Sequence, residues 1–84
     1  MKVYVVHRVD MHDGELASMF IVGVSPLYED AMRILNNDFM GECERFDIDP
    51  LNNQESWIDH DFATLNCDNG MIHWEMQRKD LENV

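Results

Sequence analysis

One stretch of the chain carries a helical pattern of hydrophobic residues, and runs of β-branched residues lie on both sides of it. The pattern has spacings of three and four and consists of Leu27, Tyr28, Ala31, Ile34, Leu35 and Phe39. Ser25-Pro26 before it is a helix-start signal, with serine as the N-cap, and Gly41 after it is a helix-stop signal. We therefore expect one helix over residues 26–40, packed on one face of a sheet.

The first two strands are predicted at residues 3–9 and 20–24, which are rich in valine and isoleucine. Asp13-Gly14 between them favours a tight hairpin turn. The predicted pairs are Val9 with Ser18, His7 with Phe20, Val5 with Val22 and Val3 with Val24. This register makes a mostly apolar face, and it leaves Tyr4, Val6, Arg8 and Asp10 on a half-exposed face.

A second hairpin is predicted around Asn69-Gly70, a dipeptide that suits a type I′ turn with positive φ at both positions. The predicted pairs are Asp68 with Met71, Cys67 with Ile72, Asn66 with His73, Leu65 with Trp74, Thr64 with Glu75 and Ala63 with Met76. Phe46 and Ile48 alternate with polar residues up to Pro50, which predicts a short strand over 45–49. For Trp57-Ile58 a helical turn and a strand start both remain open.

The predicted order is therefore β-β-α-β-β-β, an α+β fold with a mainly antiparallel sheet and one helix on one face. At 84 residues, the chain has room for a single core, so we expect one domain over 1–84 with a frayed tail at 79–84. Met19, Met32 and Met76 fall at expected core positions, and Met11, Met40 and Met71 are interface candidates.

The acidic composition bears most directly on function, because 17 Asp and Glu oppose six Lys and Arg, for a net charge of −11. Such a field repels nucleic acid and anionic lipid and attracts basic surfaces. We therefore expect no direct binding to nucleic acid or membrane. The candidate partner-binding residues are Asp38, Glu42, Glu44, Asp47, Asp49, Glu55, Asp59 and Asp61. The alternative is that the acids serve only solubility.

Metal-binding and catalytic motifs are missing from the sequence. Cys43, His60, Cys67 and His73 are far apart, and no CxxC, HxxxH or HExxH occurs. No nucleophile elbow or glycine-rich phosphate loop is present. We expect no metal, no cofactor and no enzymatic activity. Two cysteines, the lack of a signal-peptide pattern and the lack of a long apolar run favour a cytoplasmic protein with free thiols.

The segments Lys2-Val3-Tyr4-Val5-Val6, Ile21-Val22-Gly23-Val24-Ser25 and Glu29-Asp30-Ala31 resemble small uncharacterised proteins of bacteria and their phages, over about residues 1–40. In size, acidity and lack of catalytic motifs, the chain also resembles phage-encoded inhibitors of the anti-CRISPR and nucleic-acid-mimic type, without a shared motif. This resemblance of type implies a viral inhibitor.

Three functional hypotheses follow. The first is an inhibitor or adaptor that presents its acids to a basic groove of a nucleic-acid-binding protein. The second is a homo-oligomeric or regulatory binding module, with a homodimer as one form, that uses an exposed aromatic or apolar sheet face, for which Tyr4, Trp57 and Trp74 are candidate anchors. A small enzyme is the third.

Overall fold

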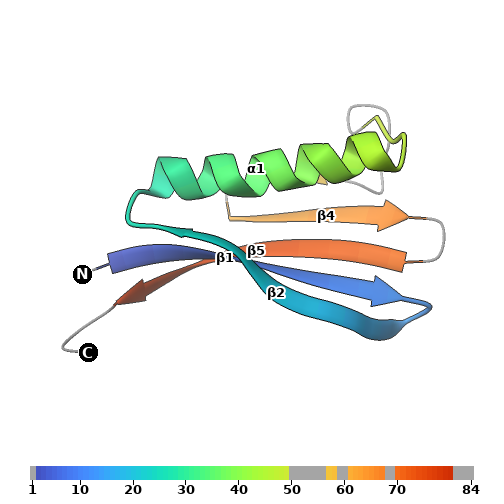
Figure 1. Ribbon diagram of the computed structural model, residues 1–84, viewed down its shortest axis with the longest axis horizontal. Helices are drawn as coiled ribbons and strands as arrows, with labels where there is room; N and C mark the ends of the chain where they lie inside the picture. Colours follow the sequence, from blue (N-terminus) through green and yellow to red (C-terminus); the bar gives the residue numbers. More distant parts are fainter. Residues whose placement is uncertain (1, 50–56, 59–60, 68–69, 81–84) are drawn as a thin grey trace.

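One helix lies along one face of an antiparallel sheet (Figure 1). The computed structural model describes residues 2–49, 57–58, 61–67 and 70–80, with only the backbone described at 57 and 58. The elements are β1 (Lys2–His12), β2 (Glu15–Ser25), α1 (Tyr28–Arg45), β3 (Trp57–Ile58), β4 (Phe62–Cys67) and β5 (Gly70–Asp80). The strands lie in the order β2-β1-β5-β4-β3, and all four neighbouring pairs are antiparallel.

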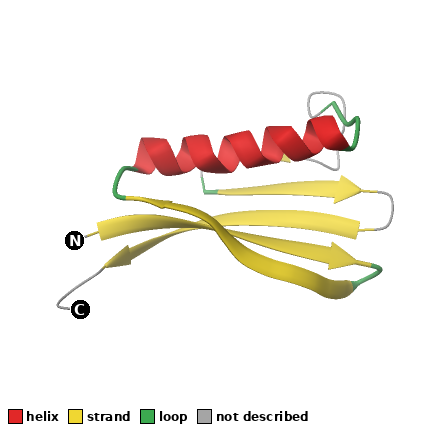
Figure 2. Ribbon diagram, viewed as in Figure 1, coloured by secondary structure: helices red, strands yellow, loops and turns green. Residues whose placement is uncertain are grey.

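This arrangement confirms the predicted α+β fold, in which a helix packs on a mainly antiparallel sheet (Figure 2). The third strand differs from the prediction, because it is formed by Trp57–Ile58 and not by residues 45–49. The frayed tail was predicted to begin too early. β5 continues to Asp80, which pairs with Lys2, so residues 79 and 80 belong to the sheet. Residues 81–84 lie outside the described part of the chain.

Both ends of α1 lie further along the chain than the sequence predicts. The N-cap is Leu27 and not Ser25, and the hydroxyl of Ser25 instead accepts a hydrogen bond from the Leu27 backbone N–H at 3.1 Å. At the other end the helix continues through Gly41 to Arg45. Burial of Cys43 against the sheet accompanies this extra turn. Packing thus outweighs the cost of a glycine inside a helix, which is about 1 kcal/mol.

The predicted strand at 45–49 is replaced by a helix-ending motif. The backbone N–H of Ile48 donates to the Cys43 carbonyl at 2.8 Å, and that of Asp47 donates to the Glu44 carbonyl at 3.1 Å. Asp47 has a left-handed φ of 56°. These bonds define a Schellman motif, which satisfies carbonyls that the helix leaves without partners at its C-terminus.

The first hairpin turns at Asp13 and Gly14, as predicted, with φ values of 53° and 81°. The predicted register holds only next to this turn, where Met11 pairs with Leu16. Two irregularities in β2, at Ala17 and Val22, then shift the pairing by one residue each, so that His7 pairs with Ile21 and Val5 with Val24. The predicted pairs beyond the turn are therefore wrong. Each bulge inserts one residue into β2 and reverses which side chains face the helix.

The second hairpin has the predicted faces but a register shifted by two residues. Cys67 pairs with Gly70, Leu65 with Ile72 and Ala63 with Trp74. Residues 68 and 69, between the paired Cys67 and Gly70, lie outside the described part of the chain. Gly70 belongs to β5 and does not have a positive φ. Its small size is needed for another reason, because a Cβ at this position would overlap the carbonyl oxygen of Met11.

The core lies between α1 and the sheet. It consists of Val6, Ala31, Leu35, Phe39, Cys43, Ala63, Leu65, Ile72, Trp74 and Met76. The rings of Phe39 and Trp74 meet edge to face with centroids 5.5 Å apart. The helix therefore covers the face that bears Val6 and Arg8, which the sequence predicts to be the half-exposed face. β4 and β5 account for this reversal, because their buried residues Leu65, Ile72 and Trp74 lie on the same side of the sheet as Val6.

Candidate functional site

A buried arginine joins the sheet to the helix through three carboxylates. Arg8 is 6% exposed. It donates two hydrogen bonds to Asp10, at 2.7 and 3.1 Å. Its Nη1 atom also donates to Asp38 at 2.9 Å and to Glu42 at 3.1 Å. The guanidinium lies 5.3 Å from the ring centre of Phe20 and 5.5 Å from that of Trp74.

The charges of this network stabilise one another. Burial by itself lowers the pKa of Arg8, but the hydrogen bonds to Asp10, Asp38 and Glu42 outweigh burial and leave the pKa above its ordinary value. Asp38 also accepts a hydrogen bond from the Trp74 indole N–H at 2.7 Å. The network therefore holds the helix against the sheet, and its carboxylates are already bound within the chain.

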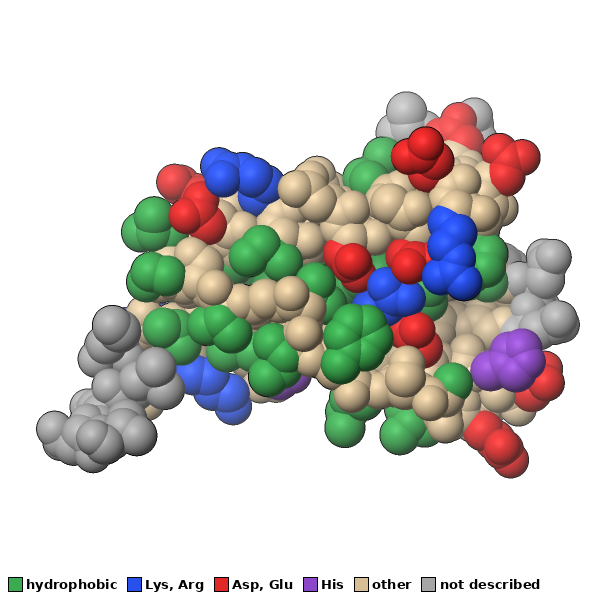
Figure 3. Space-filling model, in the orientation of Figure 1, with side chains coloured by type: hydrophobic (Ala, Val, Ile, Leu, Met, Phe, Trp, Pro, Cys, Tyr) green, Lys and Arg blue, Asp and Glu red, His purple; other side chains and the backbone are tan. Residues whose placement is uncertain are grey.

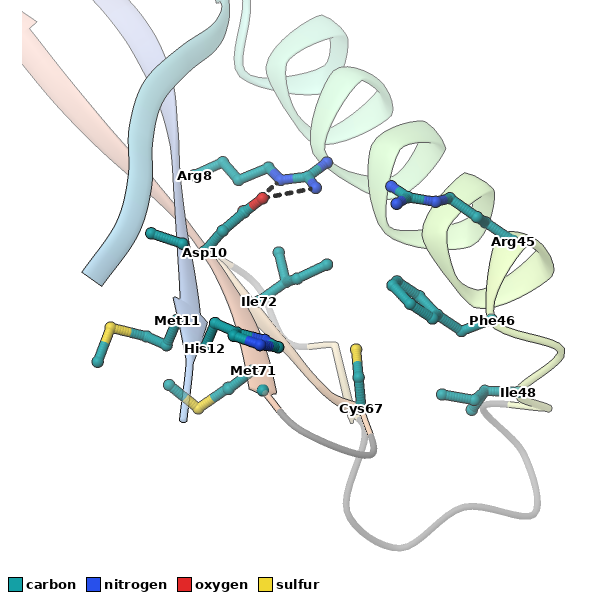
Figure 4. Close-up of a pocket in the computed structure, with 12 residues that line it drawn as sticks. Arg8, Asp10, Met11, His12, Arg45, Phe46, Ile48, Cys67, Met71 and Ile72 are labelled. Carbon is teal, nitrogen blue, oxygen red and sulfur yellow. Dashed lines mark hydrogen bonds and ion pairs between the residues drawn. The ribbon is translucent and has the colours of Figure 1, made fainter. Parts of the chain in front are cut away.

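A pocket of about 440 Å³ opens beside this network, between the C-terminal end of α1 and the strands (Figure 4). Arg8 and Arg45 extend toward each other at its rim, and its other lining residues are mostly apolar. Arg8 is bound by Asp10, Arg45 lies 3.2 Å from Glu42, and His12 lies 3.5 Å from Asp13. Among the described lining residues, the pocket thus offers a ligand no charged side chain without a partner.

None of the residues that the structure describes forms a second layer over the face of the sheet opposite α1. We call it the open face and define it by the side chains that alternate away from the helix in the observed register. They are Leu16, Met19, Ile21 and Val24 of β2, Val3, Val5, His7, Val9 and Met11 of β1, Met71, His73, Glu75, Gln77 and Lys79 of β5, and Phe62, Thr64 and Asn66 of β4.

Four large apolar side chains of β2 on this face are each more than half exposed. They form the β2 patch: Leu16 at 59%, Met19 at 67%, Ile21 at 57% and Val24 at 52%. The two bulges bring these four onto one face, because a regular strand would place Leu16 and Val24 opposite Met19 and Ile21. Met19 was predicted in the core, and its exposure shows that this prediction was wrong. The patch continues into Val9 and Met11 of β1, which are partly buried.

Charge is distributed unevenly between the open face and the rest of the surface. Among the described side chains of the open face, Glu75 is the only carboxylate, and it lies near His73 at 3.9 Å. Figure 3 shows acidic side chains at both ends of the helix, in the middle of the molecule and at the lower right, with hydrophobic side chains along much of the lower edge. The open face is therefore nearly neutral in a chain of net charge −11.

The structure places the eight acids that were predicted to bind a partner in different environments. Asp38 and Glu42 are held by Arg8, with side chains 30% and 13% exposed. Three more acids, Glu44, Asp47 and Asp49, are exposed at the C-terminal end of α1. Glu55 and Asp59 lie outside the described residues.

Asp61 is exposed but lies away from the helix end. It precedes β4, whereas Cys67 at the far end of that strand lines the same pocket as Ile48. The six residues of β4 span about 20 Å. The described acids therefore do not form one continuous surface.

The aromatic anchors predicted for a sheet face are also placed differently. Trp74 is fully buried under α1. Tyr4 lies on the helix side, with its ring 5.6 Å from that of Tyr28. The side chain of Trp57 lies outside the described part of the chain. The sequence did indicate that β2 carries many apolar residues, but it gave no sign of the bulges that gather four of them.

Comparison with protein-family models, with curated proteins and with solved structures gives no significant match to this chain. In the part of the chain that the structure describes, no helix combines the length and the hydrophobicity needed to cross a bilayer.

Proposed function

We propose that this chain is a protein-binding module whose contact surface is the open face. The observation that supports the proposal is the β2 patch, in which Leu16, Met19, Ile21 and Val24 lie exposed on one face. Large contiguous patches of exposed apolar side chains are uncommon on soluble monomers and are typical of interaction sites. A sheet with a helix on one face and apolar residues on the other gains stability when a second layer covers it.

The pocket beside Arg8 supports this function less well. Its charged lining residues have partners within the chain, so it lacks the convergent free polar groups that orient a small ligand. The open face instead combines apolar residues on β2 and β1 with polar residues on β5, such as His73 and Gln77. Protein interfaces likewise combine apolar and polar residues, and here the apolar ones lie on the edge strand β2 and its neighbour β1.

A photo-crosslinking amino acid at position 19 tests the proposal directly. The matched control carries the same amino acid at position 40, because Met40 is also an exposed methionine, at 45%, but lies on α1. In a lysate of cells that express the chain, we expect the crosslinking amino acid at position 19 to form covalent adducts with protein. The same amino acid at position 40 should form few. Equal yields from the two positions, or none from position 19, would contradict the proposal.

A second candidate function is the inhibitor or adaptor that presents acids to a basic groove of a nucleic-acid-binding protein. The observation that favours it is the exposure of Glu44, Asp47 and Asp49 at the C-terminus of α1. The negative end of the helix dipole adds to these charges. Arg45 is the cation beside them, and it is bound to Glu42. This acidic end could steer a basic partner toward the chain.

A further inference from the structure

The charge pattern limits which partner suits the open face. A basic partner would be drawn to the acidic ends of the helix, and Glu75 is the only carboxylate among the described side chains of the open face. That face therefore suits a partner surface that is apolar and nearly neutral. A second copy of this chain has such a surface.

Electrostatic repulsion limits which surfaces two copies of the chain can bring together. Two copies of a chain with net charge −11 repel each other wherever their acidic surfaces meet. The open face is where two copies can approach with the fewest opposed carboxylates. In such a pair, the β2 patch and β1 form the apolar side of the interface, and the polar side chains His73, Glu75 and Lys79 of the middle strand β5 lie beside them.

The outline of the strands sets an upper limit on the area of the open face, because Val3, Val5 and Thr64 on it are already buried in the single chain. Three of its strands have 11 residues and β4 has six. At a rise of about 3.3 Å per residue and about 4.8 Å between strands, they make a face of about 600 Å² per copy. Stable interfaces start at about 600 Å² per partner, and two sheets can pack face to face about 10 Å apart.

We infer that the occupant of the open face is a second copy of this chain, packed sheet to sheet about a two-fold axis. The inference rests on the proposed function and names its partner. The same apolar patch then lies on both sides of the interface, as a two-fold symmetric pair requires. The helices lie on the two outer sides, so their acidic ends stay in solvent.

The molar mass in solution tests this inference. We expect light scattering on the purified chain to give twice the monomer mass of 9.9 kDa, with dissociation only on dilution. The variant Met19→Lys/Ile21→Lys should be monomeric, with the dissociation constant raised by about 100-fold or more, because it places charges on the apolar side of the interface. The control Leu27→Lys/Met40→Lys adds the same charge at exposed apolar residues away from the open face and should remain dimeric. Circular dichroism checks that both variants fold.

Salt gives an independent readout. Because the two copies repel each other, screening by salt should strengthen the dimer and lower its dissociation constant. A dimer that dissociates as salt is added, or that both double variants disrupt equally, would overturn the inference. A monomer at all concentrations would also overturn it. In that case, lysate adducts from position 19 with other proteins would still support the proposed function, whereas their absence would contradict both.

Discussion

Arg8 on β1 and Asp38 on α1 are 30 residues apart in sequence, yet the Nη1 atom of Arg8 donates to the carboxylate of Asp38 at 2.9 Å. The same carboxylate oxygen accepts the indole N–H of Trp74 at 2.7 Å. One oxygen on the helix thus binds side chains from two adjacent strands, β1 and β5. These two bonds fix the position of the helix on the sheet. The Arg8–Asp38 bond joins side chains that are only partly accessible to water.

Replacing Arg8 tests how much the network contributes to stability. Arg8→Met leaves Asp10, Asp38 and Glu42 close together without their shared cation, and we expect the free energy of unfolding to fall by about 3–5 kcal/mol. Arg33→Met is the matched control. The exposed pair of Arg33 with Asp30 should contribute less than about 1 kcal/mol. Urea unfolding measures both, and equal losses would show that the network does not stabilise the fold.

A rescue variant separates charge from packing. If repulsion among the carboxylates causes the loss, adding Asp38→Asn and Glu42→Gln to Arg8→Met should restore a large part of the stability. No recovery would indicate that the lost packing of Arg8 between Phe20 and Trp74 dominates.

Two glycines should respond to alanine in opposite directions. Gly70→Ala should lower stability by about 1–3 kcal/mol, because the added Cβ overlaps the carbonyl oxygen of Met11 in the adjacent strand. Gly41→Ala should raise it by about 0.5–1 kcal/mol, because Gly41 lies inside α1 and its Cβ would meet no atom within 4 Å. Thermal unfolding of the two variants compares them directly. A stabilised Gly70→Ala variant would mean that β1 and β5 are further apart at this point.

Cys43 should make the stability fall at alkaline pH. Burial raises the pKa of the Cys43 thiol, and the charges of Cys67 and Glu42 raise it further. The folded chain therefore disfavours the thiolate, whereas the unfolded thiol ionises near its ordinary value of 9.0. The contribution of this group is present below about pH 9 and is lost as the pH rises above it. Urea unfolding from pH 7 to 10 should show a smaller decline in Cys43→Ala. An unchanged decline would assign it to other groups.

The acidic end of α1 can be tested through association rates with a basic partner captured from lysate. We expect Asp47→Asn/Asp49→Ser to slow association more than Glu29→Gln/Asp30→Asn, which removes the same charge at the other end of the helix. The Debye length falls from about 10 Å at 0.1 M salt to about 3 Å at 1 M, so the rate should fall steeply with salt. Equal effects of the two variants, or a rate that 1 M salt leaves unchanged, would exclude the acidic-end hypothesis.

The sequence alone determined the fold class and the order of the elements, but not the position of the third strand. Period-two and period-3.6 hydrophobic patterns are local signals, and so is the Asp13-Gly14 turn, whose φ values suit few residues. The faces of the second hairpin were also predicted, because a register error of two residues keeps every side chain on its own face.

The tertiary structure decided which face of the sheet is open and which acids are exposed. The bulges at Ala17 and Val22 each reverse the alternation of β2, and nothing in the local sequence marks them. Asp38 and Glu42 looked like surface acids, because their partner Arg8 is 30 or more residues away in sequence. Long-range packing also set the C-terminal end of the helix, since packing of Cys43 against the sheet extends α1 past Gly41. Long-range contacts such as these outweigh local preference, and a local pattern does not contain them.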